Sequence, residues 1–495
     1  MNELLIGWAE ENFTPKKKAK LAGQFFERIS EYVETPITAT AMAVESDGEQ
    51  MILCSCDLVS LNDDLVATAK QKIAKICDVS PEKVLFSATH THTSILYKAA
   101  GAGSTVGIIA RYMPEGKSYK EKVTAENQDV LTTEEAVEFI SDKMALAVTH
   151  AWENRKKAYF SNAFGRAAVG MCRRVVYDDG SAKMWGDTNT ANFVKLEGGN
   201  DSGIELMYTF DNEQKLTGVV ANVACPAQVL EQRSFISADY WGEVKTYLRK
   251  KYGEDLFVLG LCAPAGDQCP RDLVRWVNPE TPIDDPNVHR EHYIERRADP
   301  SMYDLKGCRL VGKRIANEIS SVYEEIEELK DSAVLKHKVL KVELPLRRVS
   351  RSEYQNAVRE LEYFAEKCKD KDWFDYADNA AMHIHAGTVA RYELQQSKDL
   401  VPIDIHIIRF GDVAIATNPF ELFLNYGNQM RARSKAKQTF LIQLAEGGPT
   451  GYLPTEDAER GSHYSAYVSG GQVGHQGGDM LVRKTVEEIN EMFAD

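Results

Sequence analysis

The sequence lacks the features that mark several large classes of protein. Among its 495 residues, no apolar run approaches the length of about 18 residues that a membrane-spanning helix needs. Acidic residues outnumber basic ones by 74 to 59, so the net charge of −15 argues against nucleic acid and membranes as partners. The nine cysteines show no paired spacing, and the N-terminal residues show no secretory signal pattern. We therefore expect a protein of the reducing, cytoplasmic compartment.

What the sequence does contain is the material for a large α/β fold. Hydrophobic residues make up 43% of the chain, and strand-like segments alternate with helix-like ones. We predict mixed β-sheets flanked by helices, with the ligand site at the carboxyl ends of the strands. The predicted strands are residues 38–44, 50–57, 83–87, 204–210, 216–223, 256–261, 403–410, 413–416 and 439–444. The predicted helices are residues 63–77, 133–152, 242–251, 314–329, 421–433 and 480–493.

No feature of the sequence divides the chain into separate domains. It has no internal repeat and no linker rich in Pro, Gly or Ser, so we predict one domain over residues 1–495. Residues 351–398 are charged and helix-forming, and we predict a helical insertion there, on the outside of the sheet. Residues 99–127 and 270–303 show no periodicity, which in a compact domain is typical of functional lids or disordered segments.

Five of the predicted strands run directly into loops rich in reactive side chains or in glycine and proline. Open α/β sheets bind ligands at the carboxyl edge of their strands, so these loops could build one site, including a metal site, from distant segments. Their shared position at strand ends carries this prediction, because no single motif among them is specific. The loops are residues 89–92, 225–226, 262–270, 418–421 and 445–452.

The histidines of the first loop form a His-x-His pair. Alternation at a strand end would turn the rings of His90 and His92 to one face, where both could reach a common ion or substrate. Two solvated histidines in a turn would give the same pattern. His383 and His385 lie in a predicted helix, where positions i and i+2 do not share a face, so we interpret that pair as structural.

Each candidate in the other loops also has an ordinary structural explanation. Cys225 fits a small buried hydrophobic residue, and Cys269, within Gly-Asp-Gln-Cys-Pro, fits either a loop thiol or a functional one. Glu421 would begin a predicted helix, whose dipole favours a carboxylate there. Tyr452 could serve in packing alone.

In their order along the chain, these motifs resemble the catalytic domain of the neutral/alkaline non-lysosomal ceramidases. That family consists of zinc-dependent amidases that cleave the N-acyl bond of ceramide, and the resemblance covers nearly the whole chain from Gly7 onward. The Thr-His-Thr-His motif implies His90 as a zinc ligand and His92 as the histidine beside the scissile bond. Pro-Phe-Glu implies Glu421, and Tyr-Leu-Pro-Thr implies Tyr452, as further zinc ligands.

The resemblance also assigns roles to residues other than the zinc ligands. At some motif positions, this sequence differs from the family. Tyr464 would donate to the developing oxyanion, and Arg174, or its neighbour Arg173, would correspond to the arginine of the family's substrate pocket. Cys225 stands where the family has the histidine of a His-Pro pair, which implies that this cysteine replaces a zinc ligand. Cys269 stands where the family has a serine proposed as nucleophile. The family's C-terminal immunoglobulin-like domain has no counterpart, and these departures make ceramide itself an unsuitable substrate.

We therefore predict a metal-dependent hydrolase that uses zinc-activated water to cleave an amide (N-acyl) bond of a small polar substrate. His92 would move a proton to the leaving group, Tyr464 would stabilise the oxyanion, and Asp267 would orient a ligand or the nucleophile. The ligands of one Zn²⁺ per chain would be His90, Cys225, Glu421 and Tyr452.

Three alternatives remain open from the residues alone. Cys269 could itself be the nucleophile, through an acyl-thioester. The same scaffold could hydrolyse an ester, lactone or glycoside, or a decayed site could leave a ligand-binding protein. Basic residues between positions 271 and 297 indicate an anionic or sugar-like substrate, although a solvated charged loop has the same composition. We expect a small-molecule substrate as partner, and the sequence allows a homo-oligomer.

Overall fold

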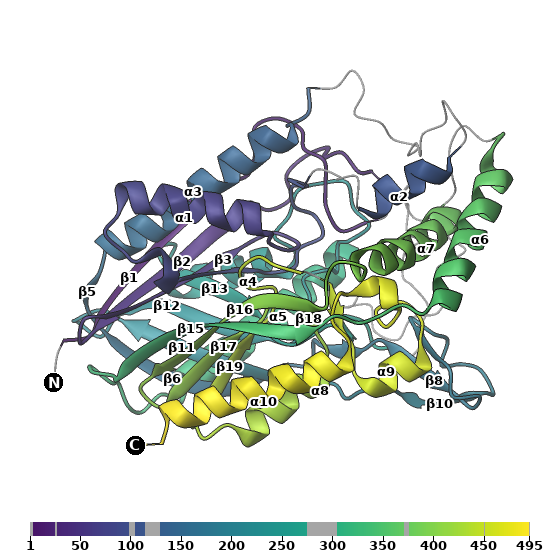
Figure 1. Ribbon diagram of the computed structural model, residues 1–495. Helices are drawn as coiled ribbons and strands as arrows, with labels where there is room; N and C mark the ends of the chain where they lie inside the picture. The colour runs from purple at the N-terminus through teal and green to yellow at the C-terminus, as the bar shows by residue number, and fades with distance from the viewer. Residues whose placement is uncertain are drawn as a thin grey trace.

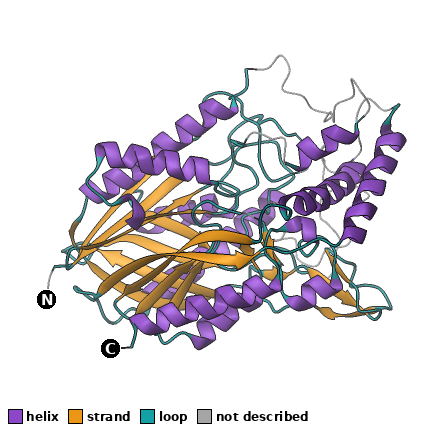
Figure 2. Cartoon of the chain, viewed as in Figure 1, coloured by secondary structure: helices purple, strands orange, loops and turns teal. Residues whose placement is uncertain are grey.

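Three larger β-sheets with helices on their outer faces make up most of the structure (Figures 1 and 2). The computed structural model describes residues 3–24, 27–98, 104–113, 129–274, 304–370, 376–449 and 451–494. The first sheet, of order β4-β3-β2-β1-β5, contains β1 (Leu5–Asn12), β2 (Thr38–Ser46), β3 (Glu49–Cys56), β4 (Val84–Ala88) and β5 (Lys156–Lys157). The second, β13-β12-β11-β6, contains β6 (Tyr159–Arg166), β11 (Gly203–Phe210), β12 (Leu216–Val223) and β13 (Phe257–Cys262). The third, β15-β16-β17-β19, contains β15 (Leu335–Pro345), β16 (Leu400–Phe410), β17 (Val413–Thr417) and β19 (Gln438–Ile442).

Shorter strands and the helices complete the described part of the chain. The small sheets contain β7 (Met171–Cys172), β8 (Arg174–Tyr177), β9 (Ala182–Met184), β10 (Phe193–Leu196), β14 (Gln268–Cys269), β18 (Glu421–Leu422) and β20 (Tyr452–Leu453). The α-helices are α1 (Asp63–Ile76), α2 (Thr105–Tyr112), α3 (Thr133–Glu153), α4 (Tyr240–Tyr252), α5 (Asp304–Glu324), α6 (Arg351–Cys368), α7 (Tyr376–Leu394), α8 (Leu424–Arg433), α9 (Glu456–Gly461) and α10 (His475–Met492). No helix within the described ranges has both the length and the apolar character needed to cross a membrane.

Alternation along the strands divides the apolar side chains between a central core and the helix layers. In β2, Ala39, Ala41 and Ala43 belong to the cluster that includes residues of α1 and α3, whereas Met42 and Val44 belong to a central cluster. The two-residue period follows from the pleat, which turns successive side chains to opposite faces. The central cluster takes side chains from all three larger sheets, among them Leu53, Leu259 and Phe440. The three sheets therefore share one core, and the helices lie outside it.

The strands and helices predicted from the sequence are present, with several shifted helix boundaries, among them the end of α5 at Glu324 rather than at residue 329. α5 begins at Asp304 rather than at residue 314, and α10 begins at His475 rather than at residue 480. α8 begins at Leu424 rather than at residue 421, because Glu421 pairs with β20 as part of β18. The sequence analysis missed β1, β6 and β15, and it missed α2 within residues 99–127. Residues 99–103, 114–127 and 275–303 of the two predicted loops lie outside the described residues.

The predicted helical insertion corresponds to α6 and α7. These two helices pack against each other and against α2 around a small core of their own, which includes Leu361, Met382 and Ile109. His383 Nδ1 lies 2.9 Å from Thr105 Oγ1, so this histidine links α7 to α2, in agreement with its structural interpretation.

A buried histidine pair predicts that the fold loses stability in acid. His337 Nε2 lies 2.8 Å from His406 Nδ1 between β15 and β16. Burial lowers the pKa of each ring to about 3, with the neighbouring ring (for His337) and Lys70 (for His406) adding to the effect. Because the unfolded chain binds protons that the folded chain does not, stability is expected to fall below pH 6.5, by at most ~1.4 kcal/mol per pH unit for each histidine. Urea denaturation between pH 8 and pH 4 measures this loss, and a His337→Gln/His406→Gln variant should have a flatter profile.

Candidate active site

The loops predicted to build the site meet because each larger sheet contains one parallel strand pair. These pairs are β3–β4, β12–β13 and β17–β19. Backbone hydrogen bonds join their carboxyl ends: Ala88 donates to Leu444, Ala263 to Val223, and Asn418 to Ile442. Loops that are hundreds of residues apart in the sequence therefore converge on one edge.

The side chain of Gln443 links three of these loops by hydrogen bonds. Its side chain is buried, and its Oε1 accepts the N–H groups of Ala265 and Leu422, each at 3.0 Å. Its Nε2 donates to Cys262 Sγ at 3.3 Å. A Cβ on Gly266 would come within 2.3 Å of the Glu421 carbonyl oxygen, so only glycine allows the two backbones to approach this closely.

His90 has an unusual backbone conformation, and its ring nitrogen Nε2 carries the lone pair. Its φ of +68° lies in the left-handed region that non-glycine residues rarely adopt. The N–H donates to Leu58, and ring Nδ1 donates to the Val59 carbonyl at 2.6 Å, which leaves the lone pair on Nε2. Nε2 lies 3.5 Å from Glu421 Oε2 and 3.3 Å from His92 Nε2.

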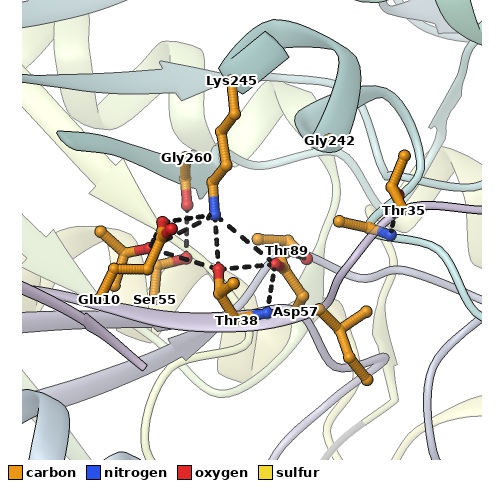
Figure 3. Close-up of polar contacts among 12 residues, drawn as sticks. Glu10, Thr35, Thr38, Ser55, Asp57, Thr89, Gly242, Lys245 and Gly260 are labelled. Carbon is orange, nitrogen blue, oxygen red and sulfur yellow. Dashed lines mark hydrogen bonds and ion pairs between the residues drawn. The ribbon is translucent and has the colours of Figure 1, made fainter. Parts of the chain in front are cut away.

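A buried ionic network supports the segment that carries His90 (Figure 3). Lys245 extends from α4 into the first sheet, where Nζ donates to Thr38 Oγ1 at 2.6 Å and lies 3.1 Å from Glu10 Oε2 and 3.7 Å from Asp57 Oδ2. Asp57 Oδ1 in turn accepts from Thr89 Oγ1 at 3.3 Å, directly before His90. Burial favours a raised pKa of Glu10, but the charges of Lys245 and Arg249 outweigh it and lower that pKa to about 2.

His92 is buried beside a carboxylate that the sequence analysis did not identify. Its Nδ1 lies 3.6 Å from Glu231 Oε2, and the ring meets that of His90 edge to face at 4.8 Å. Burial, together with the charges of His90 and Arg28, holds the pKa of His92 well below its usual value, so the ring is neutral at pH 7. Glu231 lies in the loop that follows β12, but a single acidic residue there gives no signal that distinguishes it from a solvated side chain.

Two phenols and a buried guanidinium form the opposite side of the cluster. The rings of Tyr452 and Tyr464 are 5.5 Å apart and nearly perpendicular. Arg173 is 3% exposed, and its Nη2 donates to Gly266 O at 3.0 Å and to Tyr452 Oη at 3.3 Å. Burial and the charge of Glu421 raise the pKa of Tyr464 to about 12, so its hydroxyl keeps its proton at neutral pH.

Arg174, the predicted substrate contact, has a different environment from Arg173. Adjacent residues of a strand point to opposite faces, and the Arg174 guanidinium pairs with Glu197 and donates to the carbonyls of Tyr464 and Ser462. These contacts brace the segment that carries Tyr464. Arg173 is therefore the arginine that lies among the predicted catalytic side chains.

Cys225 does not join His90, Glu421 and Tyr452. Its thiol donates to the carbonyl of Val169 at 3.4 Å and belongs to the core cluster between the second sheet and α4. Burial raises the pKa of this thiol well above its usual value.

Cys269 and Asp267 lie behind the cluster rather than at its centre. The Cys269 thiol is buried and donates to Arg271 O at 3.3 Å, and burial raises its pKa to about 12 despite the nearby charges of Arg173 and Arg271. Asp267 Oδ1 accepts the N–H of Leu424 at 2.9 Å, so this carboxylate fixes the start of α8 to the loop.

The structure brings some of the predicted zinc ligands close together, and the zinc site itself stays a prediction. His90 Nε2 and Glu421 Oε2 are close together, and Glu421 and Tyr452 are paired across β18 and β20. Within the described residues, no group of three or more His, Cys, Asp or Glu side chains is arranged to hold a metal ion. A zinc ion here would depend on the Tyr452 phenol as third donor, and catalytic zinc sites commonly have three protein ligands.

The three helix-covered sheets, whose parallel strand pairs end at this cluster, form a fold that is similar to that of solved neutral ceramidases. The chain is similar to the solved neutral ceramidase from Pseudomonas aeruginosa, with 14% identity and a TM-score of 0.65 over 98% of this chain and 74% of that one. A structure described as ceramidase complexed with C2 matches with 11% identity and a TM-score of 0.67 over the same shares. No protein-family model and no curated protein matches the chain. The fold is therefore ceramidase-like, with a sequence that has diverged widely.

Proposed function

We propose that this protein is a hydrolase that cleaves an amide bond of a small polar substrate. The observation that carries the proposal is the convergence of two imidazoles, a carboxylate, two phenols and a guanidinium at the carboxyl ends of parallel strands. The ceramidase-like fold supports amide cleavage as the reaction class. The buried charges of Arg173, Glu421 and Glu231 favour a polar substrate, because a lipid chain would leave them unpaired.

The arrangement assigns a distinct task to each side chain. Tyr464, protonated at neutral pH, and Arg173 can both donate to an oxyanion in a site that excludes water. His92 is neutral, so it can accept a proton and pass it to the leaving amine. Glu231 Oε2 lies 3.6 Å from Nδ1, so this carboxyl group would stabilise the ring electrostatically when it takes up the proton.

Zinc is the cofactor that the family resemblance implies, and the residues that would hold it are His90, Glu421 and Tyr452. Bound there, the ion would supply Lewis acidity for the scissile carbonyl and for water. The hydrogen bond from His90 Nδ1 to Val59 fixes the tautomer that such a ligand needs.

The test measures zinc content and hydrolysis on the same preparations. We expect about one zinc per chain in the wild type and in Cys225→Ser, and loss of zinc in His90→Ala. His92→Ala should keep its zinc but lower kcat by about 10²–10⁴ on N-acetyl and N-succinyl amino acids.

Full activity of His92→Ala would contradict the mechanism, and zinc loss in Cys225→Ser would restore that cysteine to the ligand set. No hydrolysis by the zinc-loaded wild type would remove the amidase proposal for these substrates.

A further inference from the structure

Arg391, on α7, is a buried arginine with two guanidinium nitrogens that have no hydrogen-bond partner. The residue is 7% exposed, and both its Nε and its Nη1 atoms are buried with no acceptor. Among the described residues, no carboxylate forms an ion pair with it. An unpaired buried charge costs several kcal/mol, so proteins rarely keep one without a counterion.

The surroundings of Arg391 form a narrow seam between α7 and the segment that follows Tyr464. Gly387 lies one helical turn before Arg391 on the same face of α7, and a Cβ there would come within 2.6 Å of Ser469. This glycine lets α7 approach residues 468–470 closely, and Arg391 lies one turn further along the helix.

A second arginine lies close to Arg391 and increases the positive charge. Arg347 Nη1 donates to the carbonyls of Ala466 at 2.9 Å and Tyr467 at 3.3 Å, and its Nε lies 3.6 Å from Glu459. Burial and the charge of Arg347 lower the pKa of Arg391 to about 10, which still leaves it protonated at pH 7. Glu459 also accepts from the N–H of His475, so it serves Arg347 and α10 rather than Arg391.

We propose that Arg391 binds a small oxyanion, a carboxylate or a phosphate, in the seam between α7 and residues 466–470. The buried Nε and Nη1 groups of Arg391 lack acceptors, and an oxygen of a carboxylate or phosphate can accept a charge-assisted hydrogen bond from such a group. The site is separate from the amide-cleaving cluster and does not depend on the proposed function. An anion held there would fasten the helical insertion to the segment that carries Tyr464.

Thermal unfolding of the full chain in chloride buffer of constant ionic strength, with added inorganic phosphate or acetate, tests the proposal. We expect phosphate or acetate to raise the Tm of the wild type by about 2–3 °C at about 100 times its Kd. Arg391→Met should abolish this shift, and without the anion its Tm should be no lower than that of the wild type, because the buried unpaired charge is gone. Arg359→Met, an exposed arginine on α6, is the matched control and should keep the full shift.

Calorimetric titration of the wild type and Arg391→Lys provides a second measurement that does not depend on the folding of the methionine variant. The lysine keeps the charge but loses the Nε and Nη1 donors, so its Kd for the anion should rise at least about tenfold. A larger response to phosphate than to acetate would identify a phosphate site, and the reverse a carboxylate site. No response of the wild type to either anion, or an equal response in Arg391→Met, would overturn the proposal.

Discussion

Replacing Arg173 with methionine is expected to lower kcat for amide hydrolysis by about 10²–10³, with a smaller change in KM. The guanidinium is buried beside the hydroxyl of Tyr452, where a donor aimed at a developing oxyanion acts without competition from water. An interaction made mainly in the transition state affects kcat, whereas one made equally in the bound substrate affects KM.

The control for this substitution is a second arginine outside the cluster. Arg166 is exposed at the end of β6, and Arg166→Met should leave both kinetic constants unchanged. Arg173→Lys separates charge from geometry, because lysine keeps the cation without the planar fork. A raised KM with unchanged kcat in Arg173→Met would show that this residue only binds the ground state.

Replacing Lys245 with methionine is expected to reduce the free energy of unfolding by about 3–5 kcal/mol at pH 7. The change removes the cation that lies between Glu10 and Asp57 (Figure 3), so that Asp57 loses its ion pair and Glu10 keeps only Arg249. Breaking a buried ion pair is costly because the remaining charge stays desolvated. Urea denaturation monitored by circular dichroism measures the loss.

Two further variants show whether the cost comes from the unpaired carboxylates. Lys251→Met removes an exposed lysine of the same helix, paired with Glu324, and should change stability by less than about 1 kcal/mol. Adding Glu10→Gln and Asp57→Asn to Lys245→Met should recover part of the lost stability, because the uncompensated charges are then absent. A triple variant less stable than Lys245→Met would contradict the charge-based explanation.

The sequence alone determined the elements and the positions of the reactive loops. Period-two alternation in β2 and β12 and helical periodicity in α1 and α3 arise from local backbone geometry, so they can be read without the fold. The two motif histidines, His90 and His92, were predicted to share a face, and their rings are in contact. β15 was missed because lysines alternate with its apolar residues, and α2 because its short apolar segment lies in an irregular region.

Only the tertiary structure decided which of the candidate side chains act together. Arg173 and Arg174 are neighbours of the same type, yet one lies beside Tyr452 and the other pairs with Glu197. The surroundings of Cys225 and Glu231 are also known only from the structure. The Cys225 thiol lies in the core, and Glu231 lies beside His92. The contacts that settle these cases join segments from different sheets, such as the 279 residues between Arg173 and Tyr452. A local pattern carries no information about such pairs, because packing between sheets sets the direction of each side chain.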